Sequence, residues 1–150
     1  MDFWRALVVT ASDERQAEIY ERQIESAINR GIISRDKPVF CVPDKDGKRV
    51  GSGGATLNAI LAAREAKGPG PVVVLHSGGD SRRIPLCTIT GKAFSRLPDG
   101  KNSYYTPFDK MLESLRLLFN QNTESRPLDG CVIATTHVLI DLTTPVVNIT

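Results

Sequence analysis

The residues best suited to chemistry in this 150-residue chain follow a short apolar run, Val72–Leu75. They are glycines, polar residues and basic residues in one short span: Gly78, Gly79, Asp80, Ser81, Arg82 and Arg83, with Lys92 further on. Glycines let the backbone approach a ligand without a Cβ, and backbone N–H groups in such a turn can bind an anion. Arginine binds phosphate oxygens through paired donors. The pattern predicts a nucleotide-phosphate site; the alternative is a polar loop that only ends a strand.

A second glycine-rich segment lies about twenty residues earlier in the chain. It comprises Gly51, Ser52, Gly53, Gly54, Ala55 and Thr56, and precedes Leu57, Ile60 and Leu61 at helical spacing. We interpret it as a glycine loop that leads into a helix. A helix N-terminus carries partial positive charge and unpaired N–H groups, so it favours a phosphate or the acceptor edge of a base. The alternative is a flexible hairpin or linker.

The elements that must position these segments alternate along the chain. Four apolar runs predict strands, at Ala6–Thr10, Val39–Val42, Val72–Leu75 and Cys131–Ala134. The first helix is predicted from a capping box at Asp13 and Gln16 and from a buried stripe of Ala17, Tyr20, Ile24, Ala27 and Ile28. Another is predicted after Thr106 and Pro107, with a stripe of Met111, Leu115, Leu118 and Phe119. This order predicts an α/β fold, with a mostly parallel sheet and helices on both faces.

The loops after parallel strands should lie along one edge of the sheet. The Cys131–Ala134 run reads as a buried strand, and the thiols of Cys41 and Cys131 are expected to be buried and reduced. Tyr20 is expected to pack in the core. Tyr104 and Tyr105 are expected to pack against the following helix rather than to stack on a base or a sugar.

Composition limits the functional classes. Hydrophobic content of 41%, charged content of 24% and a net charge of +2 fit a soluble globular protein and do not indicate nucleic-acid or membrane binding. The three cysteines are far apart and form no C-x-x-C motif, so neither a zinc site nor a disulfide framework is predicted. No signal peptide and no apolar run of ~18 residues is present. A cytoplasmic location is expected.

Two other nucleotide-binding classes fit poorly. A dinucleotide-binding oxidoreductase needs G-x-G-x-x-G after its first strand, and Ala11-Ser12-Asp13 stands there. The glycine-serine phosphate loop of small-molecule kinases such as fucokinase usually has a longer run of small residues, which Ala55-Thr56-Leu57 does not supply.

Four segments in the same order carry a family resemblance. They are FWRALVVTASDERQAEIY at 3–20, DKDGKRVGSGGATLNAI at 44–60, LHSGGDSRRIP at 75–85 and GKAFSRLP at 91–98, with a weaker match near 130–139. The chain resembles the GDP-L-fucose pyrophosphorylases, which are L-fucose-1-phosphate guanylyltransferases, and the matching domain of bifunctional fucokinase/GDP-fucose pyrophosphorylases. The resemblance implies a Rossmann-like nucleotidyltransferase sheet and transfer of GMP from GTP to L-fucose 1-phosphate.

The resemblance also implies roles for single residues. Sugar nucleotidyltransferases generally carry G-G-x-G-T-R-L-x-P; here Gly78, Gly79, Arg83 and Pro85 fit approximately, and Ser81 replaces the third glycine. Arg83 is expected to hold the leaving pyrophosphate, and Lys92 to neutralise charge near the α-phosphate. Arg82 is expected to be a supporting surface charge. The segment from Gly51 to Thr56 is expected to contact the nucleotide.

Mg²⁺ is the cofactor expected from the family. The family has an aspartate after the strand that corresponds to Cys131–Ala134, whereas this chain has His137 there. Histidine is a poor Mg²⁺ ligand because hard cations prefer oxygen. Asp80 and Asp141 are other candidate carboxylates, so the metal ligand stays unidentified. Both His76 and His137 are taken as packed or solvated residues.

Members of the family are considerably longer than this chain. Residues 1–150 are therefore expected to be the N-terminal part of a nucleotidyltransferase domain. Three functions stay open: an active guanylyltransferase, a non-catalytic nucleotide-binding fragment, or part of a bifunctional fucokinase.

Overall fold

The sheet is built from all the predicted strands. The computed structural model describes residues 4–68, 70–77, 87–97, 104–121 and 130–135. The strands are β1 (Ala6–Ala11), β2 (Val39–Pro43), β3 (Val72–His76) and β4 (Cys131–Thr135). They form one four-stranded sheet in the order β2-β1-β3-β4, and every neighbouring pair is parallel. The predicted parallel sheet is confirmed.

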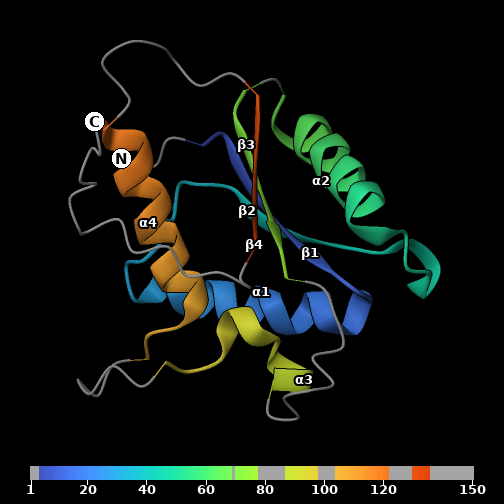
Figure 1. Cartoon of the computed structure of the whole chain (residues 1–150), viewed down its shortest axis with the longest axis horizontal. Helices are drawn as coiled ribbons and strands as arrows, with labels where there is room; N and C mark the ends of the chain where they lie inside the picture. The colour runs from blue at the N-terminus through green and yellow to red at the C-terminus, as the bar shows by residue number, and fades with distance from the viewer. Residues whose placement is uncertain (1–3, 69, 78–86, 98–103, 122–129, 136–150) are drawn as a thin grey trace, which may run out of the picture.

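Helices cover both faces of this sheet, as predicted (Figure 1). The long helices are α1 (Glu14–Asn29), α2 (Gly51–Lys67) and α4 (Pro107–Gln121), and the short ones are η1 (Lys45–Gly47), α3 (Cys87–Thr90) and η2 (Lys92–Phe94). Successive residues of a strand point to opposite faces. Leu7 and Val9 of β1 therefore pack with α1, η2 and α4, whereas Ala6 and Val8 pack against Ala59 and Ala63 of α2.

Helix α1 begins where the capping box predicts. The Asp13 carboxylate accepts from the Gln16 N–H at 2.8 Å, and the Gln16 side chain accepts from the Ser12 N–H at 2.8 Å. Tyr20 is fully buried, as predicted, and its hydroxyl donates to the Ser77 carbonyl at 2.9 Å. Burial raises the pKa of Tyr20 because it disfavours the phenolate. The helix thus anchors the residue that follows β3.

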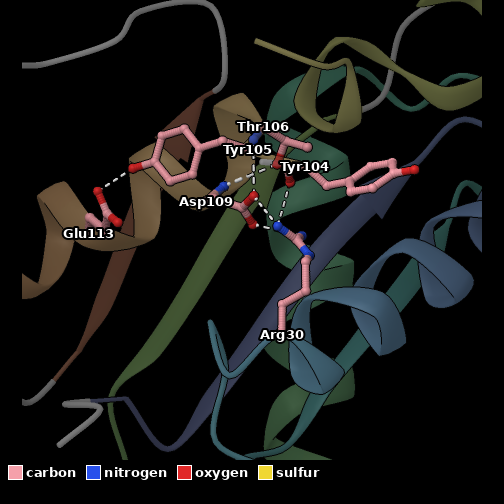
Figure 2. Close-up of polar contacts among 6 residues, drawn as sticks. All are labelled: Arg30, Tyr104, Tyr105, Thr106, Asp109 and Glu113. Carbon is pink, nitrogen blue, oxygen red and sulfur yellow. Dashed lines mark hydrogen bonds and ion pairs between the residues drawn. The ribbon is translucent and has the colours of Figure 1, made fainter. Parts of the chain in front are cut away.

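Helix α4 begins at the predicted Thr106 cap and is tied to the end of α1 (Figure 2). Thr106 and Asp109 cap each other's backbone N–H groups, at 3.3 and 2.9 Å. The fully buried Asp109 also accepts two hydrogen bonds from Arg30, at 2.7 and 3.1 Å, and Arg30 donates to the Tyr104 carbonyl. A bidentate pair of this kind fixes both side chains in one geometry. It joins two helices that pack on the same face of the sheet.

The expected packing of the two tyrosines before α4 is confirmed for Tyr105 and wrong for Tyr104. Tyr105 donates to Glu113 of α4, as the packing prediction requires. Tyr104 is 68% exposed, and the Arg96 guanidinium lies 4.3 Å from its ring centroid. On the buried stripe of α4, Met111 is buried and Leu115 packs against the core, whereas the side chains of Leu118 and Phe119 lie outside the described part.

Three expectations about burial and conformation are wrong. The glycine segment is not a loop before a helix, because α2 already begins at Gly51. The strand β4 is not buried: among the described strands it is an end strand, and Cys131, Ile133 and Thr135 are exposed. An apolar run cannot reveal which strand is at an end of the sheet. The residue Cys41 is only half-buried, although Cys41 and Cys131 are free cysteines, as expected.

Candidate functional site

A pocket of about 390 Å³ lies at the carboxyl ends of the strands. Its lining comes from all four strand ends and from the start of α2: Thr10, Ala11, Ser12, Asp44, Arg49, Gly51, Ser52, Ala55, His76 and Thr135. The chain runs from β1 outward to β2 and then returns across β1 to β3. The boundary between β1 and β3 is therefore the topological switch point, where open α/β sheets usually bind ligands.

The N-terminus of α2 forms one wall of this pocket. Gly51 and Ser52 line it, and both are exposed. The N-cap residue is Val50, which makes no side-chain capping hydrogen bond, and the first turn contains no acidic residue. Gly51 has a φ of +73°, which favours glycine. The first N–H groups of a helix have no partner within it, so this wall is suited to an anion.

The segment between β2 and α2 adds charge of both signs. Arg49 lines the pocket immediately before α2 and is exposed. Asp44 lines it directly after β2 and is half-buried, and its backbone N–H donates to the Ala11 carbonyl at 3.0 Å. Asp44 is thus held beside the end of β1. The arginine adds a phosphate-binding cation, and the aspartate adds an oxygen ligand.

His76, the last residue of β3, connects the strand ends to α2. Its Nε2 lies 2.7 Å from the Thr56 hydroxyl, and its Nδ1 lies 3.3 Å from the Thr10 hydroxyl. Burial lowers the pKa of His76, because it disfavours the imidazolium. The prediction that His76 is a packed residue is confirmed in part: it is hydrogen-bonded, but it also lines the pocket.

The structure brings only some of the predicted site residues together. Gly51 and Ser52 line the pocket, and Gly53 and Gly54 follow them in the same helix. Thr56 is not a lining residue, but its hydroxyl contacts His76, which is one. Lys92 is half-buried in η2 and is not among the lining residues. Its carbonyl accepts from the Ser95 hydroxyl at 2.8 Å. Gly78, Gly79, Asp80, Ser81, Arg82 and Arg83 lie outside the described residues.

Sequence reasoning missed several lining residues. These are Thr10, Ser12, Asp44, Arg49 and Thr135, of which none was selected as a site residue. Each follows or ends a strand, or precedes α2. The carboxyl ends of parallel strands meet at one edge, so this position was a usable signal.

The expected Mg²⁺ can be tested against the lining residues. Within the described part of the chain, no group of three or more His, Cys, Asp or Glu side chains could hold a metal ion. Asp44 nevertheless supplies a carboxylate at the pocket. Because Mg²⁺ beside a nucleotide usually takes one or two carboxylates and keeps several waters, a single carboxylate fits it. Asp80, His137 and Asp141 lie outside the described residues.

One further observation concerns the reactivity of Cys41, and another concerns the length and hydropathy of the helices. Burial raises the pKa of the Cys41 thiol to about 12, so this cysteine is not a thiolate nucleophile at neutral pH. Among the described helices, none is long and apolar enough to cross a membrane.

Comparison with known proteins agrees with the motifs. Residues 70–149, more than half of the chain, match the model of the Fucose pyrophosphorylase domain, well beyond the motif that ends at Pro98. A bifunctional fucokinase/GDP-fucose pyrophosphorylase of Arabidopsis thaliana is 40% identical over an alignment of 119 residues, and the match covers 63% of this chain and 11% of that protein.

The fucose-1-phosphate guanylyltransferases of Mus musculus and Homo sapiens are each 31% identical over an alignment of 107 residues, and each match covers 69% of this chain. Each match covers 18% of the relative, so the chain corresponds to a small part of these proteins. No solved structure matches. The family model, which matches more than half of the chain, shows that the chain belongs to the fucose pyrophosphorylase domain family.

Proposed function

We propose that this chain supplies the nucleotide-binding part of a guanylyltransferase that transfers GMP from GTP to L-fucose 1-phosphate and releases pyrophosphate. The observation that carries the proposal is the pocket at the switch point, where Arg49 and the uncapped N-terminus of α2 meet the strand ends. The names of the relatives supply the base and the sugar.

The reaction needs positioning and charge neutralisation more than covalent catalysis. An oxygen of the sugar phosphate attacks the α-phosphorus of GTP in line, and the bond from that phosphorus to the β-phosphate's bridging oxygen breaks. Arg49 and the N–H groups at Gly51 and Ser52 bind nucleotide phosphate oxygens. Arg83 neutralises the leaving pyrophosphate, and Lys92 neutralises the charge that grows at the α-phosphate.

Mg²⁺ is part of the proposal, and it would supply charge neutralisation to the phosphates. Asp44 is the described carboxylate that would hold it, together with substrate oxygens and water. A cytoplasmic location is also proposed, because Cys41, Cys87 and Cys131 form no disulfides, as expected in a reducing compartment.

A titration of the chain with GTP, ATP and UTP, each with and without Mg²⁺, tests the binding step. We expect selective binding of GTP that is strengthened by Mg²⁺. Asp44→Asn should remove much of the strengthening, whereas the matched control Asp46→Asn, in an exposed position away from the lining, should not. Failure of a folded parent chain to bind any nucleotide would contradict the proposal.

Turnover separates catalysis from binding alone. Pyrophosphate release with GTP and L-fucose 1-phosphate is the assay, and Lys92→Ala should abolish it with little change in folding. Arg83→Ala should weaken GTP binding by about 1.5–3 kcal/mol, as expected for a lost charge-assisted hydrogen bond.

A non-catalytic nucleotide-binding chain is the second candidate, because the matches cover only 11–18% of the relatives. GTP binding without pyrophosphate release would favour it. The third candidate, part of a bifunctional fucokinase, is also consistent with the comparisons, because the Arabidopsis thaliana relative is a bifunctional fucokinase/GDP-fucose pyrophosphorylase. The matching family model is that of the pyrophosphorylase domain.

A further inference from the structure

We propose that His76 is a positioning residue, which holds the first turn of α2 against the ends of β1 and β3 in the arrangement that binds nucleotide phosphates. This inference rests on the proposed function, because it assigns a task within the same pocket. His76 connects three elements through two hydroxyl groups, Thr10 on β1 and Thr56 on α2. In this way it links both sides of the switch point to the wall that faces the ligand.

One assignment of the protons agrees with all of these contacts. When the Thr56 hydroxyl donates its one proton to the Ser52 carbonyl at 2.8 Å, it accepts from His76. Nε2 then carries the imidazole proton. Nδ1 is then the acceptor for the Thr10 hydroxyl at 3.3 Å, with the Leu75 carbonyl as a longer alternative at 3.5 Å. A neutral imidazole with the proton on Nε2 satisfies every contact.

The same arrangement argues against a direct chemical role. Both ring nitrogens are engaged by protein groups, so neither is available to take a proton from the substrate. The charged groups that line the pocket with His76 are Asp44 and Arg49, from the segment between β2 and α2. The lining residues of β1, α2 and β4 carry no charge. His76 thus acts through Thr56 and Ser52, and Ser52 lines the pocket.

Substitutions at His76 can separate its two hydrogen bonds. His76→Leu removes both. His76→Gln places an amide N–H near the position of Nε2 and keeps the contact to Thr56, whereas His76→Asn places an acceptor near Nδ1 and keeps only the contact to Thr10. We expect His76→Leu to raise the dissociation constant for GTP about five- to tenfold, as for a lost hydrogen bond. His76→Gln should restore the parent value within about twofold, and His76→Asn should resemble His76→Leu.

Hydrogen exchange of the ligand-free chain tests, without GTP, whether His76 holds the start of α2 against the strand ends. His76→Leu should speed exchange at the amides of residues 54–56, the first that are hydrogen-bonded within α2, and leave the first turn of α4 unchanged. Thr56→Val, which removes the hydroxyl with little change of shape, should do the same, and combining it with His76→Leu should add little. This second variant keeps the test decisive if His76→Leu folds poorly.

The outcomes are distinguishable. If the parent binds no nucleotide, both the proposed function and the role of His76 in positioning a ligand site are contradicted. The exchange data then still show whether His76 holds the start of α2 in place. If the parent binds GTP and His76→Leu binds equally well, the inference alone is overturned. A direct role of the imidazolium in phosphate binding predicts stronger GTP binding as the pH falls through the pKa of His76, with loss of that dependence in His76→Gln. Equal pH profiles of the parent and His76→Gln support positioning, as does weaker GTP binding by the parent alone at low pH, because a protonated Nδ1 cannot accept from Thr10. GTP binding that strengthens at low pH in the parent alone contradicts positioning.

Discussion

The N-termini of α2 and α4 begin helices of similar length, 17 and 15 residues, in opposite ways. At α4, Thr106 and Asp109 cap each other, and the buried Asp109 is paired with Arg30 (Figure 2). At α2, the N-cap is Val50, whose φ and ψ of −89° and 0° differ from the extended backbone of a typical cap. Glycines and an exposed arginine surround it.

The difference between these two helix N-termini indicates that the α4 terminus contributes to stability and the α2 terminus to ligand binding. A helix N-terminus whose donors and positive field are already neutralised by its own chain offers little to an external anion. The α4 terminus is capped by its own side chains, and its Asp109 links α4 to the end of α1 through Arg30. Within the described part of the chain, the α2 terminus has no side-chain cap and no acidic residue in its first turn, and it lies on the pocket. Substitutions at α4 should therefore change the free energy of unfolding, and substitutions at α2 should mainly change GTP binding.

The largest effect is expected at Asp109. Asp109→Ala removes the cap of α4 and leaves Arg30, only 29% exposed, without its carboxylate. We expect a loss of about 3 kcal/mol in the free energy of unfolding, measured by chemical denaturation. The control is Glu25→Ala, which breaks the exposed ion pair with Arg35 and should cost less than about 1 kcal/mol. Equal losses in the two variants would remove the distinction between a buried tie and a surface pair.

The second prediction concerns a negative charge introduced at the N-terminus of α2. Val50→Asp places a negative charge at the start of α2 and should weaken GTP binding by about 1 kcal/mol at low salt, because it competes with phosphate for the positive end of the helix. Val50→Asn has a similar shape without the charge and serves as the matched control. Titrations at rising ionic strength should bring the two variants together. A Val50→Asp chain that binds GTP like Val50→Asn would show that no phosphate lies near this terminus.

Helix α1 provides a third case. Its N-terminus also lies near the pocket, since Ser12 is a lining residue, but Asp13 and Gln16 close it. Asp13→Ala should lower the free energy of unfolding by about 1 kcal/mol through loss of the cap. Titration of the folded variant should give the parent dissociation constant for GTP. A marked change in that constant would mean that nearness to the pocket, and not the open cap, decides what a helix terminus binds.

Much of the fold could be predicted because its signals are local. Asp13 with Gln16, and Thr106 with Pro107, marked the starts of α1 and α4. Exposure was harder to predict. Ile133 of β4 is 59% exposed despite its apolar run, because the sheet order leaves β4 at an edge. Leu57 and Leu61 are exposed as well, since α2 packs through Ala59 and Ala63 instead.

The motifs identify only part of the site. The glycines at the start of α2 are visible in the sequence, and Gly51 and Ser52 do line the pocket. Thr10, Asp44 and His76 belong to three different strand ends, and only the parallel pairing of β1 with β2 and β3 brings them together. Such pairing depends on contacts between distant residues, which local patterns do not encode.

The smallest predicted effect is also the most specific, because stability and binding should change in opposite directions. A Cβ at Gly53 would meet no atom within 4 Å, and the residue lies inside α2. Gly53→Ala should therefore stabilise the free chain by about 0.5–1 kcal/mol, since alanine favours the helix. If a phosphate approaches the backbone of this turn, the added methyl group should weaken GTP binding several-fold. Gly51→Ala, at a φ of +73°, should instead lower both stability and binding. A Gly53→Ala chain that is more stable and binds GTP unchanged would mean that the missing side chain serves no ligand, and the contrast between α2 and α4 would then rest on Val50 and Arg49 alone.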